Sequence, residues 1–168
     1  EFGKIFRTLG FDISRDKIYD CQRCHDQTGE VDYQSFKDSK LTKFTSDPNR
    51  LNQADVVIIC VPTPINSKNE PELNLLKSAV KLVAQNLKKG ATVVLESTVY
   101  PGLTEDICIR ILEQHSDGKW KTDFFVGYSP ERINPGDKVR SVRNIVKVVS
   151  GDSEKTLKLL SNIYGKII

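Results

Sequence analysis

The feature that most constrains the fold is an unbroken apolar run that follows Asp55, from Val56 to Val61, and stops at Pro62-Thr63-Pro64. The run is too short for a helix core and rich in β-branched residues. It therefore predicts a central strand covered on both faces, as in a parallel sheet. The two prolines cannot donate to a strand ladder and forbid a helix directly afterwards. The chain must leave the strand in an extended loop, at the edge where open α/β sheets bind ligands.

The rest of the chain alternates short strands with amphipathic helices. Further strands are predicted over residues 8–13, 41–45, 91–95, 122–128 and 145–149. Helices are predicted over residues 14–23, 47–54, 73–87, 107–112 and 153–164, and the polar stretch 24–40 is interpreted as a loop. Strands that alternate with helices indicate an α/β fold with a mainly parallel sheet.

Length and charge narrow the possible classes of protein. A chain of 168 residues predicts one domain with its own core. A net charge of +3 is too small to attract nucleic acid or a membrane surface strongly. No stretch approaches the roughly 20 apolar residues of a membrane span, and the N-terminus carries no apolar signal region. We therefore expect a cytoplasmic protein.

The four cysteines are irregularly spaced, which indicates free thiols. The stretch Cys21-Gln22-Arg23-Cys24-His25 matches the c-type haem attachment pattern, but that chemistry belongs to exported proteins. No second Cys or His pair completes a tetrahedral set, so no metal site is predicted. Cys60, within the predicted strand, is expected to behave as a small hydrophobe and is a poor nucleophile candidate.

Asp12 ends the predicted strand 8–13, and Ser14 follows where a helix N-cap is expected. In dinucleotide-binding folds, an acidic residue just after the second strand accepts the hydroxyls of the adenosine ribose. It also repels the extra phosphate of NADP. The alternative is that Asp12 is a turn or capping residue.

Three polar loops follow predicted strands. They are Val61-Pro62-Thr63-Pro64-Ile65, Glu96-Ser97-Thr98-Val99-Tyr100-Pro101-Gly102 and Tyr128-Ser129-Pro130-Glu131-Arg132-Ile133-Asn134-Pro135-Gly136-Asp137. In this order and spacing they resemble the nucleotide-sugar 6-dehydrogenases, in the UDP-glucose and UDP-N-acetylhexosamine branch. The third loop is most similar to UDP-N-acetylmannosamine and UDP-N-acetylgalactosamine dehydrogenases. The resemblance covers nearly the whole chain, although Cys24 stands where such sequences usually have glycine.

The family oxidises the C6 alcohol of the sugar to a carboxylate in two hydride transfers to NAD, through a thiohemiacetal on a cysteine. The resemblance implies a Rossmann-like, doubly wound NAD-binding domain over residues 1–168, without the first strand and glycine-rich turn of the family. It implies a UDP-sugar substrate, a homo-oligomer, a role in polysaccharide or capsule biosynthesis, and no nucleic acid or membrane partner. The resemblance further implies that the catalytic Lys and Asn of the family, on a long helix, and its nucleophilic Cys, in a further domain, would lie beyond Ile168. Neither Cys60 nor Cys108 occupies the context of the nucleophile.

The resemblance also implies roles for individual residues. Cofactor-binding residues would be Asp12, Lys17, Val61, Pro62, Thr63, Glu96, Ser97 and Thr98, and substrate-binding residues would be Glu131, Arg132, Ile133, Asn134 and Pro135. Thr98 and Glu131 would be catalytic: hydrolysis of a thioester needs a carboxylate near a water, and a hydroxyl can orient that water. The alternatives are a solvated loop acid for Glu131, a helix N-cap for Thr98, and pairing of Arg132 with Asp137.

The chain has no methionine and begins as if within a helix, so we interpret it as a fragment. In the doubly wound order, the first strand lies between strands 8–12 and 56–61. We therefore predict that these two strands pair directly, or that a strand is borrowed from another copy, and that the isolated chain neither binds NAD tightly nor turns over UDP-sugar. The alternative functions are a UDP-glucose 6-dehydrogenase and a non-catalytic α/β nucleotide-binding module.

Overall fold

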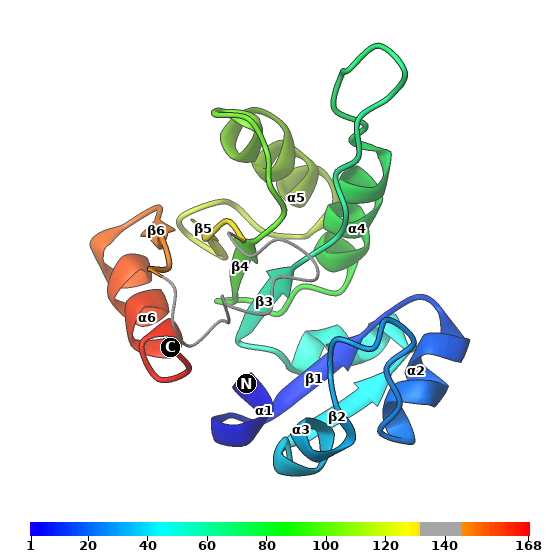
Figure 1. The fold of residues 1–168 in the computed structure, drawn as a ribbon. Coiled ribbons are helices and arrows are strands. Elements are labelled where there is room, and N and C mark those ends of the chain that lie inside the picture. Colours follow the sequence, from blue (N-terminus) through cyan, green and yellow to red (C-terminus); the bar gives the residue numbers. More distant parts are fainter. Residues whose placement is uncertain (132–145) are drawn as a thin grey trace.

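The computed structural model describes residues 1–131 and 146–168, which form strands and helices in alternation (Figure 1). The strands are β1 (Thr8–Phe11), β2 (Thr42–Thr45), β3 (Val56–Ile59), β4 (Thr92–Leu95), β5 (Phe125–Tyr128) and β6 (Ser150–Gly151). The helices are α1 (Phe2–Ile5), α2 (Arg15–Gln22), α3 (Tyr33–Asp38), the 3-10 helix η1 (Pro48–Gln53), α4 (Asn74–Gln85), the π-helix η2 (Thr104–Ile109), α5 (Arg110–His115) and α6 (Glu154–Tyr164).

The strands form two sheets. β1 and β2 pair in parallel, and a separate four-stranded sheet has the order β3-β4-β5-β6. Its first three strands are parallel and β6 is antiparallel to β5. The register aligns Ile59 with Leu95 and Leu95 with Tyr128, so β3, β4 and β5 end level with one another. The loops that leave these strands therefore start side by side.

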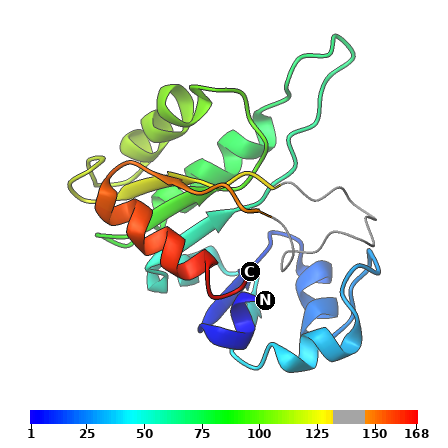
Figure 2. The same ribbon diagram turned by 60° about the vertical axis from the view of Figure 1, so that its left-hand side comes forward.

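Helices cover both faces of the four-stranded sheet (Figure 2). On one face, α4, η2 and α5 enclose the larger hydrophobic core with side chains of β3, β4 and β5. On the other face, Leu160 and Tyr164 of α6 pack with Val94. Every residue of β4 is buried. A mainly parallel sheet covered on both faces confirms the predicted Rossmann-like, doubly wound class.

Short polar residues set the helix starts that the sequence predicts. The Ser14 side chain accepts from Lys17 N at 3.3 Å, and the Ser153 side chain accepts from Thr156 N at 3.1 Å. These hydroxyls satisfy backbone amides that have no partner within the first helical turn. Asp47 caps η1 in the same way, with proline at the first position of that helix.

Two predictions about local structure are wrong. The stretch 24–40 is not entirely a loop, because α3 forms within it; Asp32 caps this helix by accepting from Ser35 N at 2.6 Å. The strand predicted over 145–149 is instead the two-residue strand β6, while residues 146–149 have no regular structure and residue 145 lies outside the described residues. Val146 is 81% exposed, so this apolar run does not face the core as a strand would.

The prediction of β3 as a central strand is also wrong, since β3 forms one end of the four-stranded sheet and its Val56 and Ile58 are only half-buried. Direct pairing of β1 with β3 does not occur either. Side-chain packing joins the two sheets instead: Phe11 at the end of β1 packs against the larger core, and the Phe2 ring of α1 lies 5.8 Å from the Tyr164 ring. Pairing with a strand from another copy remains a prediction.

The chain ends lie side by side in both ribbon views, where α1 meets the end of α6 (Figures 1 and 2). None of the helices formed by residues 1–131 and 146–168 has the length and apolar character of a membrane span.

Candidate functional site

The loops after β3 and β4 are joined by two hydrogen bonds from their hydroxyl side chains. Ser97 Oγ donates to the Val61 carbonyl at 2.7 Å, and Thr63 Oγ1 donates to the Thr98 carbonyl at 2.8 Å. Ser97 is buried, whereas Thr98 is exposed. The pair of bonds fixes the course of both loops and leaves the Thr98 side chain open to a ligand.

The loop after β5 lies against the loop after β4. Ser129 N donates to the Leu95 carbonyl at 3.0 Å, and Glu131 N donates to the Glu96 carbonyl at 3.2 Å. The fully buried Ser129 side chain donates to the Val148 carbonyl at 2.8 Å. This last bond holds the segment before β6 beside the carboxyl ends of β4 and β5.

Four side chains meet at this edge of the sheet, and we call them the Lys147 cluster: Glu96, Glu131, Lys147 and Tyr164. Lys147 Nζ lies 3.4 Å from Glu96 Oε1 and 3.4 Å from Glu131 Oε2. The Tyr164 hydroxyl donates to Glu96 Oε1 at 2.6 Å. The side chains of Lys147 and Glu96 are 5% and 13% exposed, while that of Glu131 is 39% exposed. One cation thus lies between a nearly buried carboxylate and a solvent-accessible one.

The two neutral groups around Glu96 keep their protons. Burial, followed by the hydrogen bond to Glu96, raises the pKa of Tyr164 above its ordinary value, so its hydroxyl remains a donor. Cys60 lies just after β3. The residue as a whole is exposed to solvent, but its Sγ atom lies 3.6 Å from Glu96 Oε2. Burial of the thiol, followed by the Glu96 charge, raises its pKa to about 12. The prediction that Cys60 lies within the strand is wrong, because β3 ends at Ile59. The raised pKa of its thiol makes Cys60 a poor nucleophile.

Asp12 and Lys17 form a separate corner at the carboxyl end of β1. Asp12 Oδ1 accepts from Ser14 N at 2.9 Å, and Asp12 Oδ2 accepts from Lys17 Nζ at 3.0 Å. Both side chains are partly open to solvent. Among the described residues, the hydrogen bonds and ion pairs of these two side chains stay within this corner and do not reach the Lys147 cluster.

The structure therefore brings Val61, Thr63, Glu96, Ser97 and Thr98 together with Glu131. Pro62 lies exposed between two of them. Four predicted substrate-binding residues, as well as the alternative partner Asp137, lie outside the described residues: Arg132, Ile133, Asn134 and Pro135.

Thr98 is not a helix N-cap, because η2 begins only at Thr104 and its N-cap position is Leu103. Sequence reasoning also missed Lys147 and Tyr164. Neither belongs to a motif, and only the fold brings them to Glu96.

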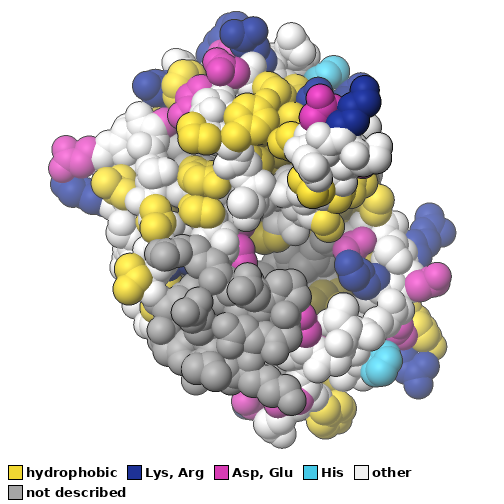
Figure 3. All heavy atoms as spheres, turned by 45° about the horizontal axis from the view of Figure 1, so that its top comes forward, with side chains coloured by type: hydrophobic (Ala, Val, Ile, Leu, Met, Phe, Trp, Pro, Cys, Tyr) yellow, Lys and Arg dark blue, Asp and Glu magenta, His cyan; other side chains and the backbone are white. Residues whose placement is uncertain are grey.

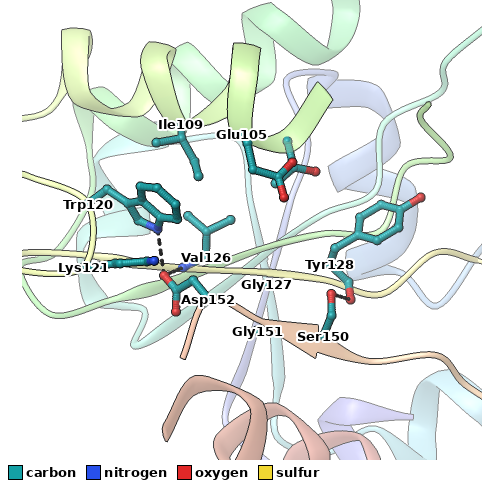
Figure 4. A pocket seen from close by; sticks show the side chains of 11 residues that line it. Glu105, Ile109, Trp120, Lys121, Val126, Gly127, Tyr128, Ser150, Gly151 and Asp152 are labelled. Carbon is teal, nitrogen blue, oxygen red and sulfur yellow. Dashed lines mark hydrogen bonds between the residues drawn. The ribbon is translucent and has the colours of Figure 1, made fainter. Parts of the chain in front are cut away.

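Apart from these loops, a hollow of about 320 Å³ lies along β5 and β6, beneath η2 (Figure 4). Its wall includes Trp120, whose Nε1 donates to Asp152 Oδ2 at 2.8 Å. The same oxygen accepts from Val126 N at 2.8 Å, and Asp152 Oδ1 accepts from Thr156 Oγ1 at 2.7 Å. Asp152 is thus held by structural hydrogen bonds, and this hollow contains none of the predicted site residues.

Charged side chains of both signs are interspersed on the face of the molecule that Figure 3 shows. Among the described residues in that view, neither sign forms one large region. Among the described residues, no group of three or more His, Cys, Asp or Glu side chains could hold a metal ion.

A doubly wound parallel sheet, with polar loops at the carboxyl ends of its strands and an acidic residue after β1, defines a Rossmann-like nucleotide-binding domain. The chain belongs to the UDP-glucose/GDP-mannose dehydrogenase family: the model of the NAD binding domain of that family matches residues 4–168.

Known proteins resemble the chain over its whole length. It is 43% identical over 168 residues to the UDP-N-acetyl-D-glucosamine 6-dehydrogenase of Pseudomonas aeruginosa, covering 100% of this chain and 40% of that protein. It is 42% identical over 167 residues to protein CapL of Staphylococcus aureus, covering 99% of this chain and 39% of that protein. The chain thus spans about two fifths of the length of these relatives.

The fold is also that of a solved relative. The UDP-D-ManNAc dehydrogenase of Pyrococcus horikoshii superimposes with a TM-score of 0.86 at 30% identity, covering 99% of this chain and 41% of that protein.

Proposed function

We propose that the chain is the NAD-binding domain of a UDP-N-acetylhexosamine 6-dehydrogenase, with UDP-N-acetylglucosamine as the first substrate to test. The observation that carries this proposal is 43% identity over all 168 residues to an enzyme named for that substrate, against 35% over 126 residues to the Pyrococcus horikoshii mannosamine enzyme. The proposed reaction is R–CH2OH + 2 NAD⁺ + H2O → R–COO⁻ + 2 NADH + 3 H⁺. When bound, NAD supplies the acceptor for the two hydrides.

The corner formed by Asp12 and Lys17 fits an adenosine ribose. The Asp12 carboxylate accepts one hydrogen bond at each oxygen, which leaves acceptor capacity for hydroxyl donors. Its position after β1 and its partial exposure support this role. The loops after β3 and β4 would line the remainder of the cleft through Val61, Pro62 and Thr63, with Glu96 and Ser97 near the reacting end.

Glu131 and Thr98 are the proposed catalytic residues. Glu131 is accessible to water, and its carboxylate would take a proton from the water that hydrolyses the acyl intermediate. The Thr98 side chain is exposed while its backbone is held by Thr63, so it would orient that water or the reacting oxygen. Arg132 to Pro135 would contact the sugar and its phosphates.

The test uses the full-length protein that carries this domain. We expect formation of two NADH for each UDP-N-acetylglucosamine consumed, measured by absorbance, and a uronic acid product identified by mass spectrometry. UDP-N-acetylmannosamine, UDP-N-acetylgalactosamine and UDP-glucose are the comparison substrates. Faster turnover of UDP-glucose than of every N-acetylated sugar would replace the proposal by a UDP-glucose dehydrogenase. No NADH with any of the four would favour a non-catalytic nucleotide-binding module.

We further propose that the protein acts in the cytoplasm as a homo-oligomer and supplies an acidic sugar for a capsule or other surface polysaccharide. These proposals rest on the family resemblance alone. The mass of the full-length protein by light scattering would test its assembly.

A further inference from the structure

Helix α6 packs closely on the four-stranded sheet because a glycine lies at the contact. A Cβ atom added at Gly127 of β5 would clash with Leu160 Cδ1 of α6. Gly127 is aligned with Val94 of β4, and Leu160 belongs to the same buried cluster as Val94. The contact of Leu160 with the sheet therefore fixes the position of α6 along β4 and β5.

This position brings Tyr164 of α6 to Glu96. Tyr164 lies four residues after Leu160, and Glu96 lies two residues after Val94. Four residues rise about 6 Å along a helix, and two residues rise about 6.6 Å along a strand. Glu96 continues the ladder after β4, since its N donates to the Ile59 carbonyl at 2.9 Å. Its side chain thus points to the same face as Val94, where it accepts from the Tyr164 hydroxyl at 2.6 Å.

The hydrogen bond between Tyr164 and Glu96 is sheltered from solvent. Tyr164 is 2% exposed, and its ring packs edge-on against the Phe2 ring at 5.8 Å. The Glu96 side chain is 13% exposed. Lys147 Nζ lies 3.4 Å from the same carboxylate oxygen, so the Tyr164 hydroxyl makes the shorter contact. A hydrogen bond to a charged acceptor in such surroundings is stronger than one between neutral groups.

Glu96 is the first residue of the loop after β4, and its side chain borders the loop after β3. Its Oε2 lies 3.6 Å from Cys60 Sγ. The next residue, Ser97, donates from its hydroxyl to the Val61 carbonyl at 2.7 Å. These two loops are the proposed lining of the cofactor cleft. The direction of the Glu96 side chain therefore affects the part of the cleft that would contact NAD.

We propose that Tyr164 is a positioning residue for NAD binding: its hydroxyl holds the Glu96 carboxylate, and with it the start of the loop after β4, in the arrangement that contacts the cofactor. This inference rests on the proposed function. It assigns to Tyr164 no contact with NAD or with the sugar. Its effect passes through Glu96.

The first test measures NAD binding to the full-length protein by calorimetry. Tyr164→Phe removes the hydroxyl and keeps the ring that packs on Phe2. We expect the dissociation constant for NAD to rise about tenfold, which is the smaller end of what a hydrogen bond to a charged group contributes. The control, Tyr33→Phe, removes an exposed hydroxyl of α3 and should leave the affinity unchanged. Unchanged NAD affinity in Tyr164→Phe would overturn the proposal.

Steady-state kinetics separate positioning from general damage to the fold. In Tyr164→Phe, we expect the KM for NAD to rise about as much as the dissociation constant. The kcat should change little, because saturating NAD restores the bound arrangement. A lower kcat with an unchanged KM for NAD would overturn the proposal.

A double-mutant cycle tests whether the effect passes through Glu96. Glu96→Ala should weaken NAD binding, and the addition of Tyr164→Phe should weaken it no further. Two independent, additive losses would overturn the proposal. If Glu96→Ala does not fold, Glu96→Gln serves in its place. Its neutral amide oxygen is a weaker acceptor, so the effect of Tyr164→Phe should be smaller in that background.

A further readout needs neither NAD nor a UDP-sugar. Burial, followed by the Glu96 charge, raises the pKa of the Cys60 thiol to about 12, and both depend on where the Glu96 side chain lies. We expect iodoacetamide to alkylate Cys60 several-fold faster in Tyr164→Phe than in the unmodified protein, as measured by peptide mass spectrometry. Cys108 of η2, which is 1% exposed, is the internal control and should keep its rate.

Equal rates for Cys60 in the two proteins, or a parallel rise at Cys60 and Cys108, would overturn the proposal. The first would show that Glu96 does not depend on the hydroxyl, and the second would show a general loosening of the fold. If the unmodified enzyme binds NAD but oxidises none of the UDP-sugars, the proposed function fails, while the affinities and the alkylation rates still decide the role of Tyr164.

Discussion

Asp12 is held in place by local contacts, yet it retains the capacity to bind a ligand. A backbone amide and an ammonium each contact one of its oxygens, at 2.9 and 3.0 Å, and fix the carboxylate at the carboxyl end of β1. A fixed negative charge at this position would attract ribose hydroxyls and repel the additional phosphate of NADP. We therefore expect the choice between NAD and NADP to depend on the Asp12 side chain.

We predict that the full-length protein prefers NAD to NADP and that Asp12→Ala narrows this preference. Loss of charged hydrogen bonds to the ribose, at about 1.5 to 3 kcal/mol, should weaken NAD binding by about 10- to 100-fold. Calorimetric titration with each cofactor measures both effects. Asp16→Ala, in the exposed first turn of α2, is the control. Equal use of NAD and NADP by the unmodified protein would contradict the assignment of Asp12.

Glu131→Gln should separate the two halves of the proposed reaction. The amide keeps the shape of the side chain but cannot accept a proton, so the hydrolytic step should slow by about 10²-fold or more. The first hydride transfer involves no attacking water, so its rate should change little. Stopped-flow measurement of NADH would then show rapid early formation followed by slow turnover. An unchanged steady-state rate would mean that Glu131 is only a solvated loop acid.

The sequence predicts that residues in the loops directly after strands lie near the site, because the carboxyl ends of parallel strands meet at one edge of the sheet. Ser97 and Thr63 illustrate this, since their hydroxyls join the loops after β3 and β4. Lys147 could not be predicted in the same way. It lies in an apolar run with no motif, and its contact with Glu96 depends on how β6 folds back along β5.

At the scale of elements, Asp152 joins three parts of the chain. Its carboxylate accepts from Trp120 before β5, from the Val126 backbone within β5, and from Thr156 in the first turn of α6. β6 is only two residues long and pairs with one neighbour. These hydrogen bonds therefore supply much of what holds the end of the sheet to α6.

We predict that Asp152→Ala lowers the free energy of unfolding by about 2 to 4 kcal/mol, because it leaves partly buried donors without an acceptor. Urea unfolding followed by circular dichroism measures the change. Asp117→Ala removes an exposed aspartate and should change the free energy by less than about 0.5 kcal/mol. An equal effect of the two substitutions would show that the Asp152 hydrogen bonds contribute nothing net to stability.

The strands and most helices could be predicted because apolar period and capping residues agree in them, as at Ser14 and Ser153. The predictions were wrong where a local sequence pattern was not matched by contacts with the rest of the fold. The apolar residues before β6 indicated a strand, but only Ser150 and Gly151 find an antiparallel partner in β5. α3 was missed because its residues are mostly polar, and its clearest signal is the single cap Asp32.

At the scale of the whole molecule, the two sheets differ in how much core supports them. Both hydrophobic clusters surround the four-stranded sheet, in which β4 is completely buried. Between residues 1 and 50, by contrast, Ile18 is the one buried hydrophobic side chain. Two-stranded sheets are marginally stable by themselves. The β1–β2 unit thus depends on contacts such as that of Phe11 with the main core.

We predict that, in the isolated chain of residues 1–168, backbone amides of β1 and β2 exchange with deuterium faster than those of β4. Opening of the small sheet exposes little apolar surface, so it should require less free energy than global unfolding. Hydrogen exchange with fragment-level mass spectrometry measures the difference. Equal protection of β1 and β4 would show that the two sheets unfold as one cooperative unit.

The isolated chain should also bind NAD weakly, as predicted from its strand order, because Asp12 and the other proposed cofactor residues lie on sheets that share no strand ladder. Calorimetry on residues 1–168 tests this expectation. A dissociation constant in the micromolar range would contradict it.

In the isolated chain of residues 1–168, where β1 and β3 share no ladder, bound NAD would itself connect the two sheets. The proposed ribose site belongs to one sheet and the proposed reacting end to the other, so a dinucleotide bound at both would join two sheets that are now connected by the η1 segment and by side-chain packing. Part of its binding free energy would then be consumed in restraining their relative movement. The affinity of the isolated chain for NAD would therefore depend on two properties. One is how rigidly the two sheets are already held together, and the other is how well each sheet contacts the cofactor.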